Sequence, residues 1–326
     1  MIWLTWRQFR LQALAVYGLL GVLAVVLVLA GKPVPGDVPL TSTDDLLYRG
    51  GFVVMYVLPT VIGVFWGAPL VARELEAGTH RLAWNQTVTR TRWLGTKLAA
   101  GVLAAALAAG VLSLAITWWS GSVDSAVTGS GTFSVRLSPV VFGARGVAPV
   151  GYAVFAFVLG VVLGILLRRT VVAMAATLAV FAAVQLAVPF VARPYVLPAT
   201  EETVVITASN LGRMGLTDKG EFELLTVTGP AGAWMLSNET VDGAGQVVKP
   251  PSWLAECVPP PGRSAHRPMP ARECFAKLAG DGYRQRIVYQ PADRFWPLQG
   301  METAVHLTLA ALLAALGLRW VRTRLS

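Results

Sequence analysis

The chain has 326 residues, of which 55% are hydrophobic and 14% are charged, and its mean hydropathy is +0.59. These values exclude an ordinary soluble domain and indicate an integral membrane protein. The formal net charge of +9 does not indicate nucleic acid binding, because the basic residues are scattered over loops between apolar runs. We therefore interpret the basic residues as an indication of how the chain is oriented in the membrane.

Six apolar runs are long enough to cross a bilayer, since a hydrocarbon core of about 30 Å needs about 20 helical residues. The first run follows Arg7 and Arg10, as in a signal peptide, but it exceeds the roughly 7 to 15 residues of a signal h-region, so we expect a retained anchor. The expected fold is an all-α polytopic membrane protein with a mixed or irregular insertion between its fifth and sixth spans. The expected spans are residues 11–30, 52–72, 98–119, 148–167, 171–191 and 298–318.

The Lys and Arg residues of the short loops predict the orientation. With the N-terminus inside, the inner segments carry 12 of these residues and the outer loops carry 4. We expect a plasma membrane protein with both termini in the cytoplasm. The expected parts are residues 1–191 with five spans, an extracytoplasmic domain over 192–297, and a last span with a cytoplasmic tail over 298–326.

The first ten residues, MIWLTWRQFR, combine aromatic residues at a spacing of three with two arginines. This pattern suits a helix lying in the inner membrane interface. The alternative is the frayed start of the first span with ordinary interfacial Trp anchors.

Two small-xxx-small pairs occur in the spans, Gly63 with Gly67 and Gly160 with Gly164. Such pairs let two helices approach closely. Packing within one subunit and packing between subunits are both compatible with the pattern.

The 192–297 segment holds 12 of the 20 prolines and no run long enough to span a membrane. Its β-branched or alternating stretches predict short strands over residues 203–207, 221–228 and 286–289. Cys257 and Cys274 are the only cysteines of the chain, and in an oxidising compartment they predict a disulfide contributing about 3 kcal/mol. A metal site is not expected, because His266 is the only histidine near them.

Polar groups within the spans are candidates for a pathway or gate, because burying them in lipid is costly. Gln299, Glu302 and His306 share one face of the last span, and Gln185 is a weaker candidate in the fifth. The alternative is that the three residues lie near the outer interface and reach water. The sequence contains no GxxxxGK[ST], HExxH or GxSxG, so we expect neither an enzyme nor a chain that binds nucleotide itself.

The longest polar segment between closely spaced spans is residues 73–97, RELEAGTHRLAWNQTVTRTRWLGTK. Gly78 is placed to end the helix that continues the second span, and Thr79 to cap a short helix across residues 82–84. Residues 85–91 are rich in side chains that favour turns, and residues 85–97 are expected to form the turn and the membrane re-entry.

This segment resembles the region after the second span of ABC-2 type transporter permeases. In that family an acidic residue and a Gly-Thr pair precede a turn ending in Arg, and a Lys opens the third span. The six-span layout, the interfacial N-terminal helix and an outer insertion before the last span are also similar. The matching positions are Glu74, Glu76, Gly78, Thr79, residues 87–90 and Lys97.

The resemblance implies a permease subunit of an exporter. Two permeases, as a homodimer or heterodimer in the lipid bilayer, would assemble with two separate ABC ATPases that bind ATP and Mg. Residues 73–92 would dock on the ATPase, with Leu82 and Trp84 as buried anchors. Charged residues would fix the register of docking, namely Glu74, Glu76, Arg81 and Arg90.

Two other functions remain open. A membrane sensor or scaffold would bind a ligand with its outer domain and recruit a protein with its inner loop, without transport. An intramembrane enzyme would need a stronger set of residues than Glu302 and His306.

Overall fold

The computed structural model describes residues 14, 16–18, 20–26, 29, 42–79, 89–126, 136–216, 222–254 and 270–324. The chain divides into two compact units. The helical unit comprises Met1–Ser134, Ser138–Arg193 and Phe295–Ser326, and the β unit comprises Val135–Leu137 and Pro194–Arg294. The β unit thus covers nearly the same residues as the 192–297 segment that composition sets apart.

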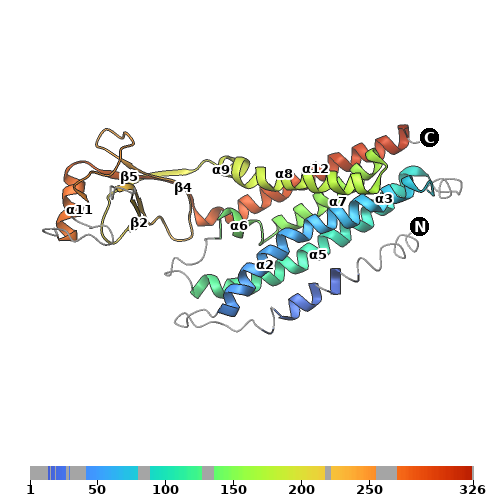
Figure 1. Cartoon of the computed structure of the whole chain (residues 1–326), viewed down its shortest axis with the longest axis horizontal. Coiled ribbons are helices and arrows are strands. Elements are labelled where there is room, and N and C mark those ends of the chain that lie inside the picture. The colour runs from blue at the N-terminus through green and yellow to red at the C-terminus, as the bar shows by residue number, and fades with distance from the viewer. Residues whose placement is uncertain are drawn as a thin grey trace. The chain divides into compact units, whose positions relative to one another are not determined.

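Long helices run side by side in the helical unit (Figure 1). The first is continuous from Ser42 to Glu76 but contains a π-helical segment, in which the Ala68 N–H donates to the Gly63 carbonyl five residues earlier. The helices are α2 (Ser42–Val61), η1 (Ile62–Gly67), α3 (Ala68–Glu76), α5 (Arg90–Ala126), α6 (Pro139–Phe142), α7 (Ala148–Leu167), α8 (Thr170–Ala187), η2 (Val188–Ala192), α9 (Arg193–Val196) and α12 (Phe295–Arg324).

Five helices among the described residues are long and apolar enough to cross a membrane. They match the second to sixth expected spans, although α2 and α5 begin several residues before the apolar runs do. The expected first span lies partly outside the described residues, which include a shorter apolar helix over Val16–Val26. The proposed interfacial helix at residues 1–10 lies outside them entirely. The candidate spans are Leu46–Glu76, Arg90–Gly121, Ala148–Leu167, Thr170–Val191 and Ala292–Arg324.

Helix α7 forms the centre of the helical unit. It packs against α2, η1, α3, α5, α8 and α12, and 16 of its 20 residues are buried. Such a helix needs apolar side chains all around its axis, which explains its unbroken sequence of apolar and small residues.

The two glycine pairs face each other across the contact between α7 and the η1–α3 segment. A Cβ atom at Gly63 would lie 2.7 Å from the Ala156 carbonyl oxygen, and one at Gly164 would lie 2.7 Å from the Ala68 carbonyl oxygen. A Cβ at Gly160 would overlap the Gly63 carbonyl oxygen, and one at Gly67 would overlap the Phe157 carbonyl oxygen. The pairs therefore serve packing within one subunit.

The β unit corrects the expectation of an all-α fold. It contains an antiparallel three-stranded sheet of order β1-β5-β4 and an antiparallel pair β2-β3. The expected strands at 221–228 and 286–289 are confirmed, the one at 203–207 lies a few residues earlier, and two further strands were not expected. The elements are β1 (Thr200–Val204), β2 (Leu211–Leu216), β3 (Phe222–Val227), β4 (Trp234–Val241), α11 (Ala271–Gly280), β5 (Arg284–Gln290) and the 3-10 turn η3 (Ala292–Arg294).

Cys274 lies on α11 in the core of the β unit, where it is fully buried with Phe275, Leu278 and Ile287. Among the described residues no cysteine is free. Cys257 lies outside the described residues, so its pairing with Cys274 stays a prediction.

The glycine contacts predict a strong effect of Gly160→Val on stability. The side chain would collide with the backbone of Gly63, Gly67 and Ala68, which cannot move independently of their helix. We expect a loss of at least about 3 kcal/mol, beyond the usual cost of overpacking. Thermal unfolding of the full chain in detergent measures it.

The matched control is Gly95→Ala on α5, because a Cβ at Gly95 meets nothing within 4 Å. This change should be neutral or slightly stabilising, since alanine favours helices more than glycine does. Equal effects of the two substitutions would contradict the packing role of the glycines.

Candidate functional site

The polar segment after the first long helix begins as the sequence predicts. Helix α3 ends at Glu76, and Gly78 follows with a φ of 69°, the left-handed conformation that glycine adopts without strain. The Gly78 N–H donates to the Leu75 carbonyl at 3.3 Å. The next residues, with the proposed docking positions Arg81, Leu82 and Trp84 and the helix that Thr79 would cap, lie outside the described residues.

The Glu74 carboxylate forms an ion pair within the chain. Its Oε1 atom lies 2.6 Å from the Lys97 Nζ, which also donates to the Leu70 carbonyl at 3.3 Å. The Lys97 ammonium is 4.8 Å from the centre of the Trp93 ring, and only 4% of the Lys97 side chain is exposed. Lys97 is therefore not a surface anchor but the buried end of an ion pair that ties α5 to α3.

Glu76 ties α3 to a second helix. Its Oε2 atom accepts hydrogen bonds from the Thr170 backbone N–H at 3.0 Å and from the Thr170 hydroxyl at 2.7 Å. Thr170 is the first residue of α8, so the carboxylate satisfies an N–H group that has no partner inside that helix. A carboxylate at this position also interacts favourably with the helix dipole.

Helix α5 begins earlier than expected. The Thr89 hydroxyl accepts from the Arg92 N–H at 3.3 Å, and the Thr89 carbonyl accepts from the Trp93 N–H at 2.9 Å. Thr89 thus caps the helix, and Arg90 is its first residue. The expected turn over residues 85–91 is corrected at its end, because residues from Arg90 onward are helical.

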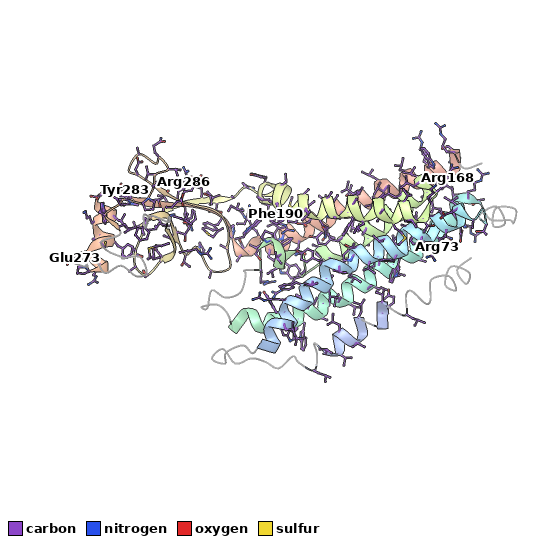
Figure 2. All side chains as sticks on the ribbon, in the orientation of Figure 1. Arg73, Arg168, Phe190, Glu273, Tyr283 and Arg286 are labelled. Atoms are coloured by element: carbon purple, nitrogen blue, oxygen red, sulfur yellow. The ribbon has the colours of Figure 1, made fainter. Side chains whose placement is uncertain are left out.

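We call the end of the helical unit that carries Glu76, Arg90 and Thr170 the hairpin end. Figure 2 shows Arg73 and Arg168 at this end. At this end Glu74 of α3 forms an ion pair with Lys97 of α5, and Glu76 of α3 accepts hydrogen bonds from Thr170 of α8. A displacement of the α3 end would therefore reach both α5 and α8.

A second polar cluster lies at the opposite end of the unit, where Arg193 and Phe295 flank the β unit in sequence. The Arg193 guanidinium binds the Glu302 carboxylate with two hydrogen bonds, Nε to Oε2 at 2.9 Å and Nη2 to Oε1 at 3.0 Å. The Tyr152 hydroxyl also donates to Glu302 Oε1. The exposed fractions of the Arg193 and Glu302 side chains are 1% and 6%.

Two of the other predicted residues lie in the same region. Gln299 Oε1 accepts from the backbone N–H groups of Val147 at 3.0 Å and Ala148 at 2.7 Å, and so caps the start of α7. His306 is fully buried, and its Nδ1 is 2.8 Å from the Glu302 carbonyl oxygen. The interpretation that Gln299, Glu302 and His306 merely reach water is therefore wrong.

Gln185 is half-buried on α8, and within the described part of the chain no hydrogen bond joins its side chain to this cluster. No group of three or more His, Cys, Asp or Glu residues among the described ones could hold a metal ion.

Sequence reasoning missed Arg193 and Tyr152. Charge balance is the signal that points to Arg193, because a buried carboxylate needs a cation and Arg193 directly follows the fifth apolar run. No pattern in the sequence indicates Tyr152, which lies in an apolar helix and meets Glu302 across 150 positions.

The five apolar helices and their charged ends define a polytopic helical membrane protein. Residues 39–193 match the family model described as ABC-2 membrane transporter related. Over this segment the chain is similar to that family, which bears out the resemblance to ABC-2 type permeases. No curated protein and no solved structure matches the chain.

The buried ion pair predicts the effect of Glu302→Gln. The substitution leaves the Arg193 cation without its counter-charge, and breaking a buried pair in this way costs about 3–5 kcal/mol. Denaturation of the full chain in detergent measures the loss. The surface substitution Glu223→Gln on β3 serves as the control.

The double variant Arg193→Met with Glu302→Gln distinguishes the loss of the ion pair from the cost of leaving one buried charge unpaired. Since it leaves no unpaired charge, we expect it to be more stable than Glu302→Gln alone. Additive losses in the double variant would contradict a direct pairing.

Proposed function

We propose that this chain is the membrane-spanning permease subunit of an ATP-driven ABC-2 type export system. A separate ABC ATPase subunit binds ATP and Mg and drives transport, and a second permease, identical or different, completes the pathway. The observation that carries the proposal is the family match over residues 39–193, which includes Glu76, Arg90 and Thr170 of the hairpin end.

The hairpin end is proposed to face the cytoplasm of a plasma membrane protein, with both termini on that side and the β unit outside. The support is the distribution of basic residues, since Lys and Arg are enriched in cytoplasmic loops. Arg73 and Arg168 lie at this end (Figure 2), and Arg169 directly precedes Thr170.

In the proposed mechanism the ATPase contacts the 73–92 segment and moves the end of α3. The Glu74–Lys97 ion pair passes this movement to α5, and the hydrogen bonds between Glu76 and Thr170 pass it to α8. This assigns Glu74 and Glu76 a role in transmission within the permease. Leu82 and Trp84 remain the proposed anchors in the ATPase, and Arg81 and Arg90 the charged residues that fix docking register.

The second candidate function is a membrane sensor whose outer domain binds a ligand. It is favoured by a pocket of about 440 Å³ in the β unit, lined by charged and glycine residues that include Glu201, Asp242, Arg284 and Arg286. In that case the chain would recruit a protein without stimulating ATP hydrolysis.

Docking is tested by the double substitution Leu82→Glu and Trp84→Glu in the full chain. Burying two carboxylates in an interface is unfavourable, so co-purification with an ABC ATPase subunit expressed together with this chain should fall at least about tenfold. The control Val247→Glu changes an exposed apolar residue of the β unit and should leave association unchanged. Undiminished association of the double variant counts against docking through this segment.

Transmission is tested by Glu76→Ala. The variant should still bind the ATPase, but ATP hydrolysis stimulated by the permease should fall by about tenfold, as expected for a lost charge-assisted hydrogen bond of about 1.5 kcal/mol. Glu273→Ala, at an exposed helical glutamate of α11, is the control. Full stimulation in Glu76→Ala would refute the role of this contact, and an absence of any stimulation in the unsubstituted protein would favour the sensor.

A further inference from the structure

The pocket of the β unit lies on the outer face of the β1-β5-β4 sheet. Residues directly opposite each other on antiparallel strands project to the same face. The register pairs Thr203 with Arg286 and Val241 with Arg284, and all four residues line the pocket of about 440 Å³. Ile287, which follows Arg286 on β5, is buried in the core on the other face. Strand pairing therefore brings the side chains of three strands to one site.

Two turns built around glycines border this face, one after β4 and one before β5. Gly245 and Gly282 have φ values of 78° and 86°, which glycine adopts without strain. The turns approach closely, because a Cβ at Gly282 would lie 3.4 Å from the Gly243 Cα atom. All three glycines line the pocket. Without side chains at these positions, a ligand has access to the backbone of both turns.

Arg286 on β5 (Figure 2) is neutralised within the sheet. Its Nη2 atom lies 2.7 Å from Glu239 Oε2, and its Nε atom lies 3.9 Å from Glu201 Oε1. These two carboxylates flank Arg286 from neighbouring strands. The guanidinium of Arg286 is therefore occupied, and Arg284 is the other cation of the pocket.

Arg284 is held at one nitrogen only. Its Nη1 atom donates to the carbonyl oxygens of Ala279 and Tyr283, both at 2.9 Å. No ion pair and no further hydrogen bond of its side chain occur within the described part of the chain. The backbone thus fixes the position of this guanidinium and leaves its Nη2 group available to a ligand.

Asp242 is held in the corresponding way at one oxygen. Its Oδ1 atom accepts from the backbone N–H groups of Ala244 and Gln246, both at 2.9 Å. Asp242 directly follows Val241, the residue opposite Arg284, yet no ion pair joins it to Arg284 or to any other described residue. The pocket therefore presents one unpaired cation and one unpaired anion, each fixed by backbone groups.

This combination of charges selects among classes of ligand. A phosphate would bind Arg284 but would also meet the negative charge of Asp242, and like charges placed together are costly. A metal ion would be repelled by Arg284, and no group of three or more His, Cys, Asp or Glu residues among the described ones could hold it. A ligand that carries both a carboxylate and an ammonium group matches both charges.

We propose that this pocket binds a zwitterion, namely an amino acid or a short peptide with two free ends. The carboxylate binds the Arg284 guanidinium, which suits planar two-oxygen groups, and the ammonium binds the Asp242 carboxylate. The volume lies in the range of small-ligand sites, about 300–1,000 Å³, and the fixed charges reduce the entropy lost on binding. The inference rests on the pocket of the sensor candidate, but binding is measurable whether or not the chain exports a substrate.

The test is titration calorimetry of the full chain in detergent with trialanine, N-acetyl-trialanine and trialanine amide. The acetyl group removes the ammonium and the amide removes the carboxylate. Since each removes charge-assisted hydrogen bonds, each blocked peptide should bind at least about tenfold more weakly than trialanine. Absence of binding by trialanine, or equal affinity for a blocked peptide, would overturn the proposal.

Two substitutions assign the charges to the two ends of the peptide. Asp242→Asn keeps the Oδ1 acceptor of the turn and should weaken trialanine about tenfold without affecting N-acetyl-trialanine. Arg284→Gln should weaken trialanine about tenfold without affecting trialanine amide. The unaffected peptide in each case shows that the pocket is still folded. A variant that weakens trialanine and its matched blocked peptide equally counts against the assignment.

The matched controls are Asp293→Asn on η3 and Arg213→Gln on β2, two exposed positions that do not line the pocket. Each removes the same charge as one test variant and should leave the affinity for trialanine unchanged. An equal loss in a control would show that only net charge matters and would overturn the proposal. A chain that stimulates ATP hydrolysis but does not bind trialanine refutes this inference alone and leaves the permease assignment intact.

Discussion

The contact between α7 and the η1–α3 segment is the constraint on which the rest of the helical unit depends. Four glycines bring two backbones so close that a Cβ at any of them would meet a main-chain oxygen. The transmembrane environment offers little hydrophobic drive for helix association, so dispersion contacts at this distance carry much of the stability. The same contact fixes the position of the α3 end, and hence which helices Glu74 and Glu76 can reach.

Polar side chains connect the helices at both ends of this contact, and two of them do so by capping a neighbour. Glu76 on α3 caps α8, and Gln299 on α12 caps α7. A helix end that lacks partners is costly away from water. A partner from another helix satisfies the N–H groups and also fixes the axial position of one helix relative to the other. A cap from the same helix satisfies the N–H groups but has no such effect.

The sequence predicts the features that depend on local pattern. The apolar runs, the glycine pairs, Gly78 as a helix end and the strands around 222–227 and 284–290 follow from periodicity, small-residue spacing and backbone preference. It does not predict the start of α5 at Arg90, because counting apolar residues ignores a cap such as Thr89. Nor does it reveal that Lys97 pairs with Glu74, or Arg193 and Tyr152 with Glu302, since these partners meet only through helix packing across 23 to 150 positions.

The π-helical segment η1 has a geometric consequence for the hairpin end. It lies between Pro59 and Pro69, and the missing N–H of Pro69 removes an α-helical hydrogen bond beside it. A π turn holds about one residue more than an α turn, and one residue of an α-helix corresponds to a rotation of about 100° and a rise of about 1.5 Å. The extra residue held in η1 therefore sets the direction in which the end of α3 faces. With an α turn in its place, Glu74 and Glu76 would lie about 100° further round the axis, away from Lys97 and Thr170.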